Sequence, residues 1–247
     1  MNISPETLIG LGLILIVLFS FWGRDNPKRA FRSIKSFSEL QRDIELSVED
    51  GSRLQIGLGP SGLLGPQSAA AFAGLTLLRQ VAEIASDSDQ PPIATTGDGA
   101  LMLLAQDTLR SNYRRLGIRD QYHARLARVT GLTPFSHAAG ALPLILDRSV
   151  LGSALVGSFG NEVGLISDAS QRTGGFTIGG SDQISSQAIL FASAEQPLIG
   201  EELYASGAYT GAGPAHQASL RAQDALRWLI IILLTITALM PLFGGSQ

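Results

Sequence analysis

Two long apolar runs flank a central segment in which short apolar stretches alternate with amphipathic ones. The first run covers residues 7–22, and the second covers residues 229–240, directly after Trp228. Each approaches the length that a helix needs to cross the hydrocarbon core of a bilayer, so the pattern predicts two transmembrane helices. For the second run the alternative is a buried core helix, although core helices of this length usually keep a polar face.

The second run is predicted to be the end of a longer helix that begins in water. Residues 219–227 carry charged side chains but neither proline nor glycine, so nothing in them interrupts a helix. We therefore expect one helix from Pro214 to Phe243, on which the central domain is mounted rigidly.

The central segment predicts an α/β domain with a mainly parallel sheet and helices on both faces. Ile44, Leu46 and Val48 alternate with polar residues before Asp50-Gly51, and the alternation resumes at Leu54, which predicts an N-terminal β-hairpin. Short apolar strands then alternate with longer apolar helices, the pattern of right-handed crossovers. Strands are expected at 54–58, 93–96, 129–133, 153–157, 176–179 and 197–199, and helices at 69–85, 100–115, 138–146, 162–171 and 183–194.

Charge sets the expected orientation of the domain. The 247 residues carry a net charge of −3. The segment from Arg24 to Lys35, however, contains five basic residues and only one acid, Asp25. The positive-inside rule then places the domain in the cytoplasm and both chain ends outside the cell membrane. The expected parts are a transmembrane helix at 1–23, a basic connection at 24–43, the cytoplasmic α/β domain at 44–213, and a helix continuing into the second span at 214–247.

Tryptophan and arginine mark the expected membrane interface. Trp22 closes the first span and Trp228 opens the second, so both indole rings are expected at the inner interface, where they are favoured. Basic residues beside them favour anionic headgroups by about 1 kcal/mol per charge. The lipid bilayer is thus a predicted partner, contacted at the interface by Trp22, Arg24, Lys28, Arg29, Arg227 and Trp228.

Missing residue types exclude several kinds of chemistry. The chain has no cysteine, which excludes disulfides and thiolate sites. Its only lysines are Lys28 and Lys35, both before the domain, so the domain has no lysine for a phosphate-binding loop or a Schiff base. Ser61 does not stand in a G-x-S-x-G sequence. We expect no catalytic residue and no cofactor.

A glycine motif follows the first strand after the hairpin. Gly57, Gly59 and Gly62 match G-x-G-x-x-G, which in some α/β folds binds a pyrophosphate. Pro60 removes a backbone donor from the loop, and Glu83, the acid at the expected spacing, falls inside a predicted helix. We expect a tight turn or a subunit-contact loop; a nucleotide site that includes Asp98 is the alternative.

Acidic residues gather where the predicted strands end. Asp98, Glu162, Asp182 and Glu201 lie at or just before helix starts, where carboxylates cap helices, so we expect caps. A divalent cation held by Glu162, Asp182 and Glu201 is the alternative. The three histidines show no metal-ligand spacing and are expected on the surface or in loops.

The domain has one basic run. Its six arginines lie between Arg110 and Arg128, and we expect a solvated face; anionic lipid or an acidic neighbouring subunit is the alternative. Nucleic acid is not an expected partner, because the net charge is negative and few aromatic residues are interleaved with the arginines.

Three stretches carry a family resemblance: residues 153–162, residues 199–209, and Gln223-Asp224 before the second span. They resemble a family of prokaryotic two-span membrane proteins with a soluble domain of unknown function. The resemblance implies the topology alone. We expect a non-enzymatic integral membrane subunit whose cytoplasmic domain mediates assembly as a homo-oligomer or with other membrane subunits. The alternative is a membrane-tethered enzyme or sensor that binds a nucleotide or divalent cation at the glycine-rich acidic edge.

Overall fold

The computed structural model describes residues 10, 12, 14–19, 34–209 and 214–243. The chain forms two compact units, one from Ser33 to Gly211 and one that combines Met1–Arg32 with Ala212–Gln247. The first, called the α/β unit below, holds every strand of the described chain and the helices from α2 (Lys35–Glu49) to α8 (Glu202–Tyr209). Helix α9 belongs to the other unit.

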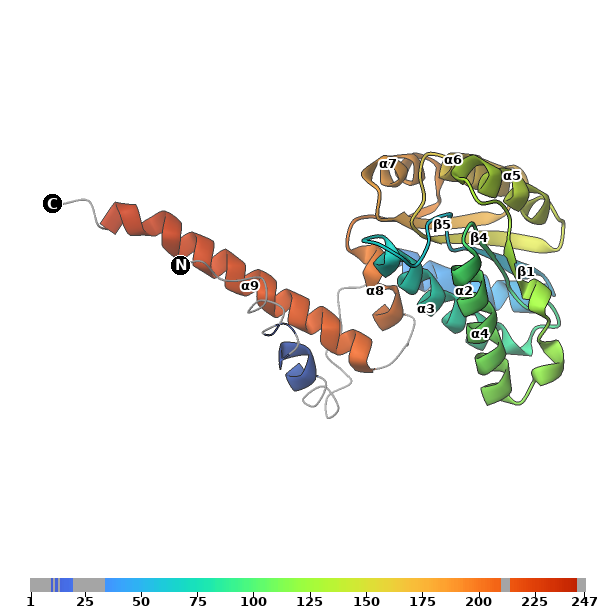
Figure 1. The fold of residues 1–247 in the computed structure, drawn as a ribbon, viewed down its shortest axis with the longest axis horizontal. Coiled ribbons are helices and arrows are strands. Elements are labelled where there is room, and N and C mark those ends of the chain that lie inside the picture. Colours follow the sequence, from blue (N-terminus) through green and yellow to red (C-terminus); the bar gives the residue numbers. More distant parts are fainter. Residues whose placement is uncertain (1–9, 11, 13, 20–33, 210–213, 244–247) are drawn as a thin grey trace. The chain divides into compact units, whose positions relative to one another are not determined.

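A single six-stranded parallel sheet forms the centre of the α/β unit (Figure 1). The strand order is β3-β2-β1-β4-β5-β6, so the chain builds outward from β1 to one edge and then crosses to β4 on the other side of β1. The predicted parallel α/β arrangement is confirmed, and the sheet is wholly parallel. The strands are β1 Arg53–Gly57, β2 Ile93–Thr96, β3 Ala127–Val129, β4 Val150–Gly157, β5 Phe176–Ser181 and β6 Gln196–Leu198.

Helices cover both faces of the sheet, as the sequence pattern predicts (Figure 1). Leu54 and Ile56 of β1 point to one apolar core, while Leu155 of β4 belongs to a second core on the opposite face. Both faces of the strands are therefore buried, as parallel sheets require. The first core is covered by α2, α3 (Ser68–Ile84), α4 (Gly99–Leu116) and α8, and the second by α5 (Pro134–Ile145), α6 (Val163–Arg172) and α7 (Ile184–Ser193).

The predicted N-terminal β-hairpin is wrong, because residues 44–48 belong to helix α2. The buried side chains of α2 recur at helical spacing and include Phe37 and Leu40, whereas Leu46 is 40% exposed. Three alternating apolar residues are too few to define a strand when a longer window has helical period. The Asp-Gly pair ends the helix instead of forming a hairpin turn: Gly51 has a φ of +63°, the left-handed conformation common just after helices.

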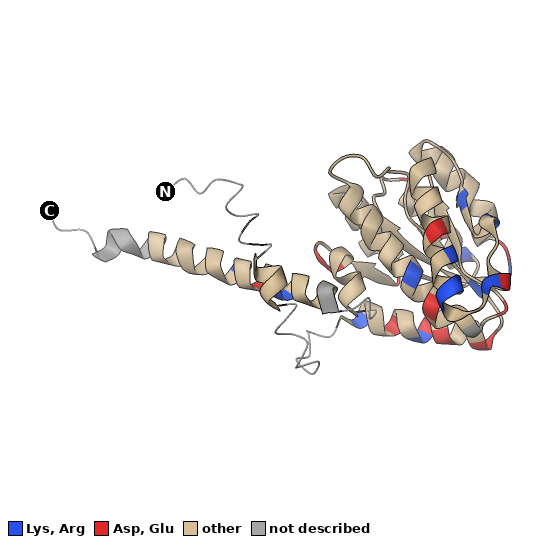
Figure 2. Cartoon of the chain, turned by 60° about the horizontal axis from the view of Figure 1, so that its bottom comes forward, with Lys and Arg blue, Asp and Glu red and all other residues tan. Residues whose placement is uncertain are grey.

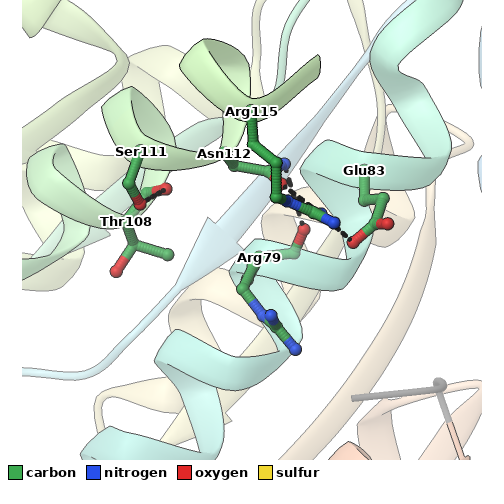
Figure 3. A network of polar contacts seen from close by, with 6 residues as sticks. All are labelled: Arg79, Glu83, Thr108, Ser111, Asn112 and Arg115. Atoms are coloured by element: carbon green, nitrogen blue, oxygen red, sulfur yellow. Dashed lines mark hydrogen bonds and ion pairs between the residues drawn. The ribbon is translucent and has the colours of Figure 1, made fainter. Parts of the chain in front are cut away.

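A polar network joins helices α3 and α4 (Figure 3). Arg115 Nη2 lies 2.7 Å from Glu83 Oε2 and donates to Asn112 Oδ1 at 3.0 Å. The amide of Asn112, a buried residue, donates to the backbone carbonyl of Arg79 at 3.5 Å. Glu83, the acid at ribose-binding spacing from the glycine motif, thus forms an ion pair between two helices.

The predicted single helix over the last part of the chain is confirmed as α9 (Pro214–Phe243). Its described charged residues, Arg221, Asp224 and Arg227, lie in its first half (Figure 2). The aliphatic residues that follow, Leu229 to Leu234 and Ile236, are each between 43 and 63% exposed. Within the described residues, no helix is both long and apolar enough to cross a membrane.

The first predicted span and its interface residues lie largely beyond the described part of the chain. Of residues 7–22, only 10, 12 and 14–19 are described, as helix. Four of the predicted interface residues, Trp22, Arg24, Lys28 and Arg29, lie outside the described residues. Arg227 and Trp228 are described, and both are exposed on α9.

Candidate functional site

The carboxyl ends of the parallel strands bring the candidate residues to one edge of the sheet, called the carboxyl edge below. The glycine motif follows β1, Asp98 follows β2, Glu162 follows β4 and Asp182 follows β5. In doubly wound sheets ligands bind at this edge, next to the point between β1 and β4 where the winding reverses. A ligand site is therefore expected at the carboxyl edge.

The glycine motif is held tightly against neighbouring backbone. Gly59 has a φ of +85°, and a Cβ at this position would lie 2.4 Å from the carbonyl oxygen of Ser158. A Cβ on Gly62 would lie 2.9 Å from Asp98 Oδ2. Helix α3 begins only at Ser68, so its N-terminus does not follow directly from the motif. These contacts give the glycines a packing role, and they put a carboxylate beside the loop, where a pyrophosphate would be repelled.

Asp98 caps helix α4, as expected. Its Oδ1 accepts a hydrogen bond of 2.7 Å from the backbone N–H of Leu101. Glu202 makes a related bond in the first turn of α8, where Oε2 accepts from the backbone N–H of Ile199 at 3.4 Å. Both bonds satisfy backbone donors near helix starts, and they need no ligand.

Glu162 and Asp182 do not make the expected caps. Glu162 is only 1% exposed. Its Oε1 accepts a hydrogen bond of 2.8 Å from the backbone N–H of Gly160, a residue that precedes helix α6. Asp182 Oδ1 is buried and has no hydrogen-bond partner among the described residues. Burial, with a smaller contribution from the charge of Asp182, raises the pKa of Tyr204. Each acid thus has its own surroundings, and in the described part of the chain no three His, Asp or Glu side chains gather as metal ligands.

His137 is buried, which corrects its expected place on the surface or in a loop. Its Nδ1 lies 2.7 Å from Thr130 Oγ1, and its ring lies 6.2 Å from the ring of Phe159. Burial lowers the pKa of His137 to about 4, with a smaller opposing contribution from the backbone of Thr96. The imidazole is therefore neutral at physiological pH and acts as a packed polar side chain.

Large apolar side chains are exposed at the carboxyl edge. Leu64 lies in the loop after β1, Leu132 and Phe135 follow β3, and Ile184 begins α7 after β5. All four are between 64 and 96% exposed. This apolar set could not be predicted from the sequence, since its exposure depends on which loops the sheet brings together.

A cavity of about 790 Å³ lies at the opposite, amino edge of the sheet. Arg53 at the start of β1, Arg125 before β3 and Arg128 within β3 contribute three cationic side chains to its lining. Gln121 lies between these arginines in sequence and also lines the cavity. This cavity could not be predicted from the sequence, because only the strand order β3-β2-β1 brings Arg53 close to Arg125 and Arg128.

The sheet order and the two helical layers define a doubly wound α/β protein. The chain belongs to the family described as Domain of unknown function (DUF6754), whose model matches residues 5–247. No curated protein and no solved structure matches the chain. The family match includes both the α/β unit and α9, so the two parts belong to one shared architecture.

Proposed function

We propose that the protein is a non-enzymatic integral membrane subunit whose α/β unit mediates assembly. The observation that carries the proposal is the apolar half of α9, where aliphatic side chains are exposed on every side of the helix. Such a helix is unfavourable in water and favourable in lipid. No charged residue follows Arg227, and the 16 helical residues from Trp228 to Phe243, at about 1.5 Å each, reach about 24 Å, most of the roughly 30 Å thickness of a bilayer core.

The hydroxyl groups in this apolar half are compatible with lipid. Thr235 Oγ1 donates to the backbone carbonyl of Ile231 at 2.7 Å, and Thr237 donates in the same way to Leu233. Each hydroxyl is satisfied within its own helix, which lowers the cost of placing it in hydrocarbon. These bonds support membrane insertion of α9 without a partner helix.

A second anchor at residues 7–22 completes the proposed topology. The α/β unit begins and ends at the same place, since Phe37 near the start of α2 stacks on Tyr209 at the end of α8. Two spans that leave from neighbouring points suit a domain tethered at both ends. The basic residues between Arg24 and Lys35 favour a cytoplasmic domain with both termini outside.

The exposed apolar residues of the carboxyl edge support assembly. Leu64, Leu132, Phe135 and Ile184 lie in loops or first helical turns that leave the sheet in one direction. Exposed apolar side chains gathered on one edge are typical of surfaces that bind another protein. We propose that this edge contacts a second copy of the chain or another membrane subunit.

A membrane-tethered enzyme or sensor is the second candidate, with a nucleotide or divalent cation at the carboxyl edge. The strand order favours it, because β1 and β4 flank the usual binding point of such sheets. The carboxylate of Asp98 lies beside Gly62 and would repel a phosphate bound there. This candidate predicts that nucleotides or divalent cations raise the unfolding temperature, and that Asp98→Ala or Glu162→Ala abolishes the effect.

Membrane fractionation tests the anchoring. Membranes from cells that produce the full chain are washed with alkaline carbonate, which removes peripheral proteins. We expect the chain to stay in the membrane pellet, and we expect Ile232→Arg with Leu233→Arg to reduce this retention, because each arginine in mid-span costs about 3 kcal/mol. The control pair Arg221→Gln with Asp224→Asn should be retained like the wild type. Complete release of the wild type by carbonate would contradict the proposal.

A further inference from the structure

The cavity at the amino edge has an excess of positive charge. Arg53, Arg125 and Arg128 line it together with His123, against the carboxylates of Asp89 and Asp120. None of the three arginines forms an ion pair with a carboxylate in the described part of the chain. Hydrogen bonds from Ser149 lower the pKa of Asp147, and the charge of Arg53 contributes less, so the charge of the three arginines remains largely available to a ligand.

Two of the three arginines, Arg53 and Arg128, are also held in place by neutral partners. Arg53 Nη2 donates to the side-chain oxygen of Gln90, and Arg128 Nε donates to the backbone carbonyl of Arg125 at 2.7 Å. Such bonds fix a guanidinium without neutralising it, so less conformational entropy is lost when an anion binds.

Two buried polar atoms of the cavity residues lack a partner. Arg53 Nε and Gln121 Oε1 are buried and have no hydrogen-bond partner among the described residues. Buried donors and acceptors are rarely left unpaired, because an unpaired one costs about 1–3 kcal/mol. Both residues line the cavity, so an unpaired buried donor and an unpaired buried acceptor lie next to the proposed site.

We propose that the amino-edge cavity binds a small soluble molecule that carries a phosphate group and hydroxyl groups. A guanidinium group can donate two hydrogen bonds to two oxygens of one phosphate. Three arginines therefore match a doubly charged phosphate better than a singly charged carboxylate. Gln121, Asp89 and Asp120 supply acceptors for hydroxyl groups. The cavity volume lies within the range of about 300–1,000 Å³ that is typical of small-molecule sites.

The position of the cavity favours a soluble molecule over a lipid headgroup. The ends of the α/β unit meet where Phe37 stacks on Tyr209, and α2 runs from there for 15 residues toward the amino end of β1. At about 1.5 Å per residue this helix spans about 22 Å. The cavity therefore lies far from the points at which the chain leaves the unit toward α9 and the N-terminal apolar run.

Calorimetric titration of the full chain in a mild detergent tests the proposal, at constant ionic strength. The probes are glycerol 3-phosphate, glycerol and a short-chain phosphatidic acid. We expect glycerol 3-phosphate to bind, glycerol not to bind, and phosphatidic acid to bind no more tightly than glycerol 3-phosphate. Arg125→Gln and Arg128→Gln should each weaken binding about tenfold or more, since each removes a charged hydrogen-bonding partner. Arg114→Gln, at an exposed arginine of α4 that does not line the cavity, is the matched control and should bind like the wild type.

Three results would overturn the proposal. The first is no binding of glycerol 3-phosphate by the wild type, and the second is equal weakening by Arg114→Gln, which would indicate unspecific attraction to positive charge. The third is binding of phosphatidic acid alone, which would assign the site to lipid. Unfolding curves of the variants without ligand show whether a variant has lost only its binding site or is also unfolded. Arg125 is exposed, so its replacement should leave the fold intact.

Discussion

The rings of Phe37 and Tyr209 stack with their centroids 5.3 Å apart and an interplanar angle of 14°. This contact joins the first turn of α2 to the last residue of α8, the two points at which the α/β unit connects to the rest of the chain. Under the proposed topology, any pull from the membrane anchors reaches the domain here. The stack therefore closes the domain at its tethered end.

We predict that Phe37→Ala lowers the free energy of unfolding of the α/β unit by about 3 kcal/mol, because Phe37 is almost fully buried and its loss leaves a cavity. Tyr209→Phe keeps the ring and should lower the free energy of unfolding by less than Phe37→Ala does. Urea unfolding of the full chain in detergent, followed by far-UV circular dichroism, measures both. An equal loss in the two variants would show that the hydroxyl, and not the stacked ring, holds the helices together.

The cap of α4 gives a second prediction. Asp98→Ala should lower the free energy of unfolding by about 1 kcal/mol, since it removes the acceptor of the Leu101 N–H, whereas Asp98→Asn keeps an acceptor and should cost less. The same unfolding experiment applies. A stability gain in Asp98→Ala would mean that repulsion dominates at this position, as in a site that awaits a cation.

His137 makes stability depend on pH. The unfolded chain binds a proton at His137 near pH 6.5, whereas the buried ring binds it only near its folded pKa of about 4. The unfolded state therefore gains protons first as the pH falls. The contribution of His137 is complete above pH 6.5 and is lost progressively down to about pH 4, by up to about 3 kcal/mol.

Unfolding free energies measured from pH 7 to pH 4 test this dependence. We expect His137→Asn to flatten the slope over that interval. A slope that survives in His137→Asn would assign the acid sensitivity to other groups.

The polar network between α3 and α4 contains a partly exposed ion pair and a buried amide. We expect the two to contribute differently to the free energy of unfolding. Glu83→Gln should cost at most about 1 kcal/mol, because the ion pair with Arg115 is partly exposed. Asn112→Ala should cost more, about 2 kcal/mol, since it also removes the buried donor to the Arg79 carbonyl. Unfolding free energies of the two variants give the comparison, and the reverse order would make the charge the main link between the helices.

Most of the fold could be predicted from hydrophobic period alone. The strand at 93–96 and the helix at 214–243 begin and end where expected, because apolar period and flanking polar residues agree there. The strand expected at 129–133 is instead Ala127–Val129, since Thr133 caps helix α5. The short alternation at residues 44–48 suggests a strand, but these residues lie within the longer helical pattern of α2.

The sites were less accessible to sequence reasoning. A capping residue is local, so the role of Asp98 could be predicted from its neighbours. Two features depend on which strands are neighbours in the sheet: the burial of His137, and the shared cavity of Arg53 and Arg125. The strand order cannot be derived from the sequence pattern alone. The same holds for the exposed apolar residues of the carboxyl edge.

A matched pair of variants on helix α7 tests the proposed assembly surface. Ile184 begins the helix at the carboxyl edge and is 85% exposed, whereas Phe191 lies in its last turns and is 71% exposed. Ile184→Asp should weaken self-association about tenfold or more, because it places a charge in an apolar contact. Phe191→Asp adds the same charge away from this edge and should have no such effect. Equal effects of the two variants would remove the carboxyl edge as the interface.

The mass of the full chain in mild detergent tests the central claim most directly. Light scattering coupled to gel filtration, corrected for bound detergent, gives the mass of the protein part at micromolar concentration. We predict a multiple of the chain mass, or a complex with a second membrane protein, for the wild type and for Phe191→Asp. A wild-type chain that stays monomeric at this concentration, with no other chain bound, would contradict a role in assembly.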